Sequence, residues 1–129
     1  MLAVATDIIV RYLTGDDQKQ ATKARALIGH EPLFVPRTVL LEVEWVLRKV
    51  YDFPATEVIP ALRALAGLPG ITFEDASLAA QAMTWAETGM DFADALHLAG
   101  AANCDGFVTF DKRFAHTAAG RGSVPVTIR

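Results

Sequence analysis

The chain has 129 residues, of which 52% are hydrophobic and 21% charged, and its formal net charge is −3. This composition predicts one compact globular domain over residues 1–129. The negative balance gives no electrostatic reason to expect tight non-specific binding to nucleic acid, although it does not exclude a nucleic-acid enzyme. Asp7 and Arg11 interrupt the first apolar run, which argues against a signal peptide and a membrane span. Cys104 is the only cysteine, so no intrachain disulfide is possible and we expect a protein of the reducing cytoplasm.

Short apolar runs alternate with longer stretches of helical periodicity along the chain. Strands are expected at residues 2–4, 33–35, 71–73, 107–109 and 124–128. Helices are expected near residues 8–13, 18–29, 38–51, 55–66, 75–88, 92–103 and 112–118. This alternation predicts βαβ units, and therefore an α/β fold whose mainly parallel sheet is covered by helices on both faces.

The expected helix over residues 38–51 shows the clearest amphipathic pattern. Its apolar residues gather into one stripe, formed by Val39, Leu40, Val43, Val46, Leu47 and Val50. Glu44 and Arg48 fall away from this stripe, and Glu42 lies at its edge, one turn into the helix. In the next expected helix, Pro54 suits the entry, whereas Pro60 is predicted to kink or split it.

Two aspartates open an otherwise apolar helix in the stretch "GMDFADALHLAGAA". Asp91 and Asp94 are three residues apart, so they share one face of its first turn. Helix capping explains this pattern well, with Asp91 at the N-cap and Asp94 reaching back as in a capping box. Taken alone, the pair favours capping over an active site.

Asp7 and Asp111 can cap helices in the same way, but capping does not explain the common placement of these acids. Asp7, Asp94 and Asp111 all follow strand ends or begin helices, and such positions meet at the carboxyl edge of a parallel sheet. Glu42 could join them. Converging carboxylates repel each other and are costly to desolvate, unless a hard cation such as Mg²⁺ or Mn²⁺ binds them. Such a site can polarise a phosphodiester and activate water for in-line attack.

Other chemistries have little support in the sequence. The three histidines lack metal-ligand spacing with one another or with Cys104, and His97 is expected on a helix face near the site. Neither a glycine-rich phosphate loop nor a G-x-S-x-G motif is present. Trp45 and Trp85 are expected to be packing or interface residues rather than base-stacking platforms, because the surrounding positive charge is sparse.

Four motifs together resemble the PIN domain, and within it the VapC-type toxins of bacterial type II toxin–antitoxin pairs. They are "AVATDIIVRYL", "LLEVEWVL", "DFADALHLA" and "FVTFDKRF", and the likeness covers nearly the whole chain. The resemblance implies a three-layer α/β/α fold with a mainly parallel central sheet. It also implies a Mg²⁺- or Mn²⁺-dependent endoribonuclease that hydrolyses RNA, is usually a homodimer, and is held inactive by a small VapB-type antitoxin.

Carried over position by position, the acidic quartet of that family falls on residue 5 and on Glu42, Asp94 and Asp111, with Asp91 a frequent further member. These acids are the implied catalytic residues and metal ligands. Thr6 and Thr109 match polar positions that line the site, and Asp7 matches the third residue of the opening motif, where its expected role is to cap the helix.

This chain departs from the family at one of these positions. The family has aspartate at position 5, whereas this chain has Ala5, so one acidic ligand is missing. We therefore expect weakened or lost catalysis without a disturbed fold, in a domain at least as stable without the acid. Either an introduced substitution or a natural loss of activity explains Ala5, and the otherwise intact quartet favours the first.

Three functions remain to be distinguished. The favoured function is a ribonuclease toxin in a disabled or weakened form, in which rim cations such as Arg37, Lys112 and Arg113 could meet the RNA backbone. The alternative is a PIN-like module without catalysis that acts by binding an antitoxin or another protein. A phosphoacceptor receiver domain has a similar α/β rhythm, but the chain lacks the paired acids after the first strand and the lysine after the last strand.

Overall fold

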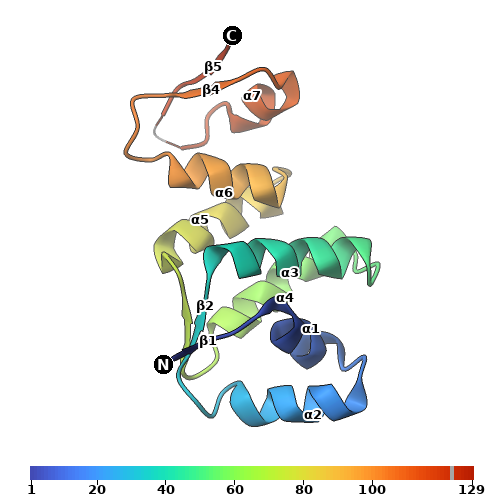
Figure 1. The fold of residues 1–129 in the computed structure, drawn as a ribbon. Coiled ribbons are helices and arrows are strands. Elements are labelled where there is room, and N and C mark those ends of the chain that lie inside the picture. The colour runs from blue at the N-terminus through green and yellow to red at the C-terminus, as the bar shows by residue number, and fades with distance from the viewer. Residues whose placement is uncertain (123) are drawn as a thin grey trace. The chain divides into compact units, whose positions relative to one another are not determined.

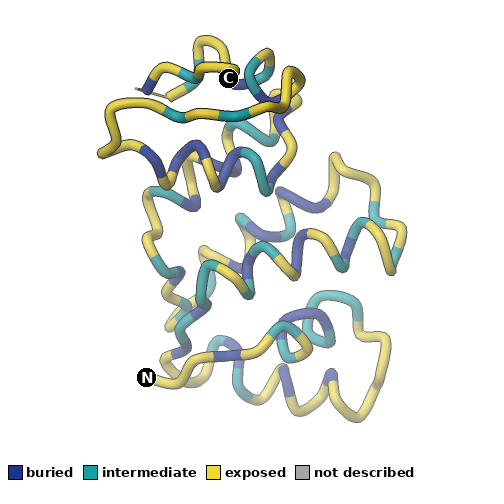
Figure 2. Tube along the Cα trace, turned by 45° about the horizontal axis from the view of Figure 1, so that its top comes forward, coloured by how far each residue is buried: buried dark blue, intermediate teal, exposed yellow. Residues whose placement is uncertain are grey.

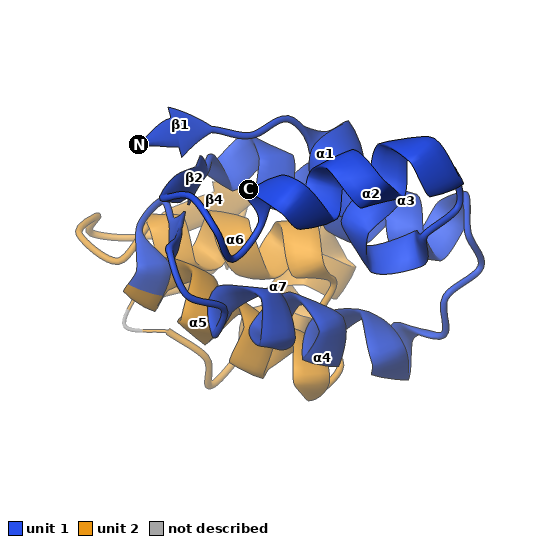
Figure 3. Ribbon diagram, turned by 90° about the horizontal axis from the view of Figure 1, so that it is seen from below, with its two compact units in different colours: residues 1–76 blue, residues 77–129 orange. Residues whose placement is uncertain are grey.

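The computed structural model describes residues 1–122 and 124–129 (Figure 1). The chain forms two compact units, unit 1 over Met1–Ala76 and unit 2 over Ser77–Arg129 (Figure 3). Each unit combines helices with parallel strands. Within the described residues, no helix is long and apolar enough to cross a membrane.

Unit 1 contains three strands and four helices, followed by the first residue of a fifth helix. In chain order they are β1 (Leu2–Ala3), α1 (Thr6–Thr14), α2 (Gln18–Leu27), β2 (Leu33–Val35), α3 (Arg37–Lys49), α4 (Ala55–Ala66) and β3 (Ile71–Phe73). Unit 2 contains α5 (Ala76–Glu87), apart from that first residue, then α6 (Phe92–Gly100), β4 (Phe107–Thr109), α7 (Lys112–Ala118) and β5 (Val126–Ile128). The elements predicted from the sequence are all present, with boundaries shifted by a few residues at most.

All described strand pairs are parallel, which confirms the predicted α/β class. In unit 1 the order is β1-β2-β3, with Leu33 of β2 opposite Leu2 on one side and Ile71 on the other. In unit 2, β4 pairs with β5 and Phe107 lies opposite Val126. Helices connect the paired strands because a parallel pair cannot be joined by a tight hairpin.

The start of α1 corrects one sequence prediction. Asp7 does not cap this helix: Ala5 occupies the N-cap, where its methyl side chain cannot accept a hydrogen bond, and the helix begins at Thr6. Asp7 lies in the first turn and is exposed, where its charge complements the positive end of the helix dipole. The helix ends at Gly15, whose positive φ of 65° closes the last turn through a bond from its N–H to the carbonyl of Arg11.

The predicted break at Pro60 is not observed, and α4 runs through it from Ala55 to Ala66. Pro54 lies at the N-cap, as expected. Pro60 lies inside the helix and is exposed, so its ring faces solvent and the helix continues with the loss of one intrahelical donor.

Helix α3 provides much of the core of unit 1, through Leu40, Val43 and Leu47 (Figure 2). The prediction that Glu44 points away from the apolar stripe is wrong, because only 5% of this residue is exposed. The guanidinium of Arg48, one turn on, donates two hydrogen bonds to the Glu44 carboxylate. This pairing is what makes the burial of a carboxylate tolerable.

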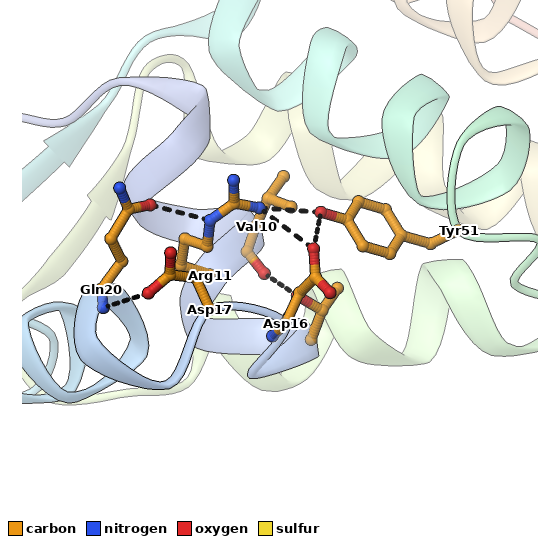
Figure 4. A network of polar contacts seen from close by, with 7 residues as sticks. Val10, Arg11, Asp16, Asp17, Gln20 and Tyr51 are labelled. Atoms are coloured by element: carbon orange, nitrogen blue, oxygen red, sulfur yellow. Dashed lines mark hydrogen bonds and ion pairs between the residues drawn. The ribbon is translucent and has the colours of Figure 1, made fainter.

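A polar network fastens the α1–α2 hairpin to the end of α3 (Figure 4). Arg11 of α1 donates to the hydroxyl of Tyr51 over 2.8 Å, and its Nε donates to Gln20 of α2 over 2.8 Å. The Tyr51 hydroxyl in turn donates to Asp16 over 3.0 Å, and Arg11 lies 3.7 Å from the same carboxylate. Tyr51 is thus both acceptor and donor between segments that lie 35 or more residues apart.

We predict that Tyr51→Phe lowers the free energy of unfolding by about 1–2 kcal/mol, because it removes both hydrogen bonds of the hydroxyl while keeping the ring. Urea denaturation measures the loss. Tyr12→Phe is the matched control, since the Tyr12 hydroxyl bonds to none of the described residues, and it should leave stability nearly unchanged. Equal losses in the two variants would show that the network contributes nothing specific.

Candidate active site

In unit 1, the candidate acid Glu42 is held by a hydrogen bond from the start of α1. The hydroxyl of Thr6, the first residue of α1, donates to Oε1 of Glu42 in α3. Glu42 is exposed and Thr6 is partly buried, so the bond leaves the second carboxylate oxygen of Glu42 open to solvent. Ala5, the position of the missing acid, directly precedes this threonine and is exposed.

The N-terminus of α3 is capped from outside the helix. Pro36 lies at its N-cap and has no side-chain acceptor, and the Glu74 carboxylate, just after β3, accepts from the backbone N–H of Arg37 over 2.7 Å. The Arg37 guanidinium pairs with Asp75 and lies 3.9 Å from Glu74. Arg37, predicted to be a rim cation that meets RNA, is already engaged by two carboxylates of its own unit.

In unit 2, Asp91 caps α6 as the sequence predicted. Its Oδ2 accepts from the backbone N–H of Asp94 over 3.1 Å. Only one carboxylate oxygen is needed for this cap, so the capping role and a ligand role are compatible. The carboxylate of Asp94 accepts no hydrogen bond from the described residues.

Asp111 caps α7 through one oxygen in the same manner. Its Oδ1 accepts from the backbone N–H groups of Arg113 at 2.9 Å and Phe114 at 3.1 Å. The hydroxyl of Thr109, at the end of β4, accepts from the backbone N–H of Asp111 over 2.9 Å. The turn from strand to helix is thereby fixed, with Oδ2 of Asp111 unused by the cap.

The three acids of unit 2 influence one another electrostatically at Asp94. Partial burial raises the pKa of Asp94, and the negative charges of Asp91 and Asp111 raise it further. The positive charges of His97 and Arg113 lower it by smaller amounts. His97 therefore lies near the acids, as predicted, and is exposed on the face of α6.

The predicted site residues divide between the two units. Unit 1 holds Ala5, Thr6, Asp7 and Glu42, and unit 2 holds Asp91, Asp94, Thr109 and Asp111. Among the described residues, no group of three or more histidine, cysteine, aspartate or glutamate side chains is arranged to hold a metal ion. The structure does bring together Asp94 with Asp91 and Asp111, and Thr6 with Glu42.

Comparison with protein-family models assigns the chain to a family. The family model described as "PIN domain" matches residues 3–120, and the chain belongs to the PIN domain family. The match runs across both units, and the parallel strands with their connecting helices agree with the three-layer α/β/α fold predicted from the motifs. PIN domains are generally metal-dependent nucleases. No curated protein matches the chain.

We predict that Asp94→Asn raises the melting temperature at neutral pH in the absence of divalent cations. Because the folded-state pKa of Asp94 is raised, its ionisation costs stability, and this cost appears as the pH rises from the ordinary aspartate value of about 3.9 through the folded-state pKa. Asparagine keeps the backbone N–H that bonds to Asp91 but carries no charge.

Thermal unfolding at pH 7 and at pH 3 measures this effect, and the gain should disappear at pH 3, where the aspartate is protonated in both states. Added Mn²⁺ should stabilise the parent chain more than the variant if Asp94 is a ligand. A gain of the same size at both pH values would exclude ionisation of Asp94 as its cause.

Proposed function

We propose that this chain is a VapC-type toxin, a Mg²⁺- or Mn²⁺-dependent endoribonuclease that hydrolyses RNA phosphodiesters, present here in a disabled or weakened form. Membership of the PIN domain family is the observation that carries the proposal. The carboxylates of unit 2 support it, because partial burial and the neighbouring acids Asp91 and Asp111 raise the pKa of Asp94, and shifted pKa values are common at functional sites.

The proposed catalytic acids and metal ligands are Glu42, Asp94 and Asp111, with Asp91 as a further ligand. The donor type suits a hard divalent cation, because Asp91 and Asp111 each retain an oxygen beyond their caps and Asp94 has both, but no three of the described acids stand close enough together to hold the ion as they are. The repulsion that raises the pKa of Asp94 is the kind that a bound cation relieves. When bound, the metal polarises the phosphodiester and makes water a competent nucleophile at neutral pH.

The surrounding residues of this chain orient these acids. Thr6 fixes one oxygen of Glu42, and Thr109 holds the turn that presents Asp111. Lys112 and Arg113 are exposed in the first turn of α7, directly after Asp111, where they can meet an RNA phosphate.

Ala5 accounts for the disabled state in two ways. It lacks the carboxylate that the family places there, and it leaves the N-cap of α1 without a side-chain acceptor. Aspartate at an N-cap stabilises a helix by about 1 kcal/mol relative to alanine. Replacing an aspartate by Ala5 therefore costs this capping contribution, which the prediction of a domain at least as stable without the acid left out.

The proposed biological setting is a toxin–antitoxin pair in the cytoplasm. The chain would act as a homodimeric single PIN domain, and a VapB-type antitoxin would hold it inactive. The single exposed cysteine, Cys104, suits a reducing compartment. A second candidate, supported by Ala5, is a PIN-like module that has lost catalysis and acts only by binding a protein.

We predict that Ala5→Asp confers Mg²⁺- or Mn²⁺-dependent cleavage of single-stranded RNA, and that adding Glu42→Gln to this variant lowers the rate by at least about 100-fold. Ala5→Ser is the matched control, because serine caps α1 but adds no carboxylate. Both variants at position 5 should gain stability, and only the aspartate variant should cleave RNA and arrest growth when expressed.

A folded Ala5→Asp protein that cleaves no RNA with either metal, and does not arrest growth, would contradict the nuclease proposal and favour the binding module. Cleavage by the serine variant at the same rate would show that the effect of position 5 is structural rather than chemical.

A further inference from the structure

The exposed residues of α3 form a single stripe that includes the candidate acid Glu42. Within this helix, which the structure describes completely, the exposed residues are Thr38, Glu42, Trp45 and Lys49. They are spaced by four, three and four residues, so they follow one another along one face of the helix. We call this set the α3 stripe.

Two neighbouring residues of α3 lie in environments opposite to those expected in a helix selected only for stability. Glu44 is buried, with 5% of its surface exposed, whereas Trp45 has 51% of its surface exposed. Burial of a carboxylate requires a partner, which Arg48 supplies, and exposure of an indole forgoes the burial of a large apolar surface. A helix selected only for stability would have the opposite arrangement.

Packing within its unit covers only about half of Trp45, so the prediction of a packing or interface residue is met only in part by packing. Trp45 stacks on no other aromatic ring among the described residues, and its indole lies one turn after Glu42. Trp85, by contrast, is half-buried, and its ring lies where a side chain added at Gly122 would meet it. The two tryptophans of the chain thus have different roles.

The stripe also supplies a cation. Lys49 follows Trp45 by one turn, is exposed, and forms no ion pair with a described residue, whereas the neighbouring Arg48 is engaged by Glu44. A helical turn rises about 5.4 Å, a distance that one nucleotide can bridge. The α3 stripe thus presents an acid, a flat aromatic ring and a free ammonium in this order. These are the groups that can act at a phosphodiester, stack on a base and bind a phosphate of one nucleic-acid strand.

We propose that Trp45 stacks on a base of single-stranded RNA beside the nucleotide that is cleaved, and that Lys49 binds a neighbouring phosphate. This inference rests on the proposed nuclease function. Base stacking on an aromatic ring is tolerant of sequence, because every base has a π face. A single strand satisfies the ring and the ammonium together, while its sugar–phosphate backbone passes Glu42.

The experiment uses the full chain with Ala5, mixed with a ten-nucleotide single-stranded RNA of mixed sequence and Mg²⁺. The chain has two tryptophans, so Trp85→Phe leaves Trp45 as its only indole fluorophore. Titration with the RNA should quench its emission to saturation. An oligonucleotide of the same length that lacks bases should bind more weakly and quench little.

Variants then separate stacking from charge. Trp45→Ala should weaken RNA affinity roughly 5- to 100-fold, whereas Trp45→Phe, which keeps a ring, should retain most of it. Lys49→Gln should reduce the slope of log affinity against log salt by about 0.7, the value for one phosphate of a single strand. Trp45→Gln provides a second ring-free variant, and circular dichroism verifies that each variant is folded.

The failures of the two proposals are distinguishable. Unchanged emission on RNA binding, or equal affinity of the parent chain and Trp45→Ala, overturns the stacking inference while cleavage by the Ala5→Asp chain still supports the nuclease. Absence of both binding and cleavage overturns both. A dimer that dissociates on Trp45→Ala, with emission insensitive to RNA, would assign Trp45 to an interface between two copies of the chain.

Discussion

The hydrogen bond from Thr6 to Glu42 is the contact that orients the candidate acid of unit 1. It joins the first residue of α1 to the exposed face of α3, so the position of a candidate catalytic carboxylate is set by where α1 begins. The other end of α1 is fastened to the end of α3 through Arg11 and Tyr51. Two separated attachments resist rotation of one helix against the other better than either would alone, and the exposed Glu42 gains a defined orientation without being buried.

The carboxylates of unit 2 show that capping and chemistry are not competing explanations. Asp91 and Asp111 each use one oxygen to satisfy backbone N–H groups at a helix start, and this bond fixes the rotamer that presents the other oxygen. Their charges nevertheless raise the pKa of Asp94, which is the cost of placing three acids together. A bound cation would offset the repulsion among the three carboxylates, so the grouped acids would destabilise the fold less with the cation than without it.

In the proposed ribonuclease, the burial of Glu44 and the exposure of Trp45 would bear on how a single strand is held beside the acids, whatever its sequence. The acids of the family define where a phosphodiester is hydrolysed, but they carry little information about the bases beside it. The proposed stacking would use the exposed indole one turn from Glu42, and the neighbouring carboxylate of Glu44 is buried and paired with Arg48.

Local sequence was sufficient to locate the helices and strands. Hydrophobic periodicity marked α3 and α4, and aspartates before apolar runs marked the starts of α6 and α7, because both signals act between residues a few positions apart. Capping signals and the motif resemblance pointed to Glu42, Asp91, Asp94 and Asp111 as candidate site residues, and this role stays a prediction. The capping signals failed at Asp7, since α1 begins two residues too early for Asp7 to be its N-cap.

The sequence by itself determined the α/β class and the order of the elements, because periodicity and capping are properties of neighbouring residues, and it named the candidate acids through the order of its motifs. Only the tertiary structure decided which side chains are buried and which distant residues meet. Glu44 is buried because Arg48 pairs with it inside unit 1, and Tyr51 joins Arg11 across 40 positions of sequence. Trp45 is exposed because no other part of its unit covers that face of α3, and helical periodicity does not report what a helix packs against.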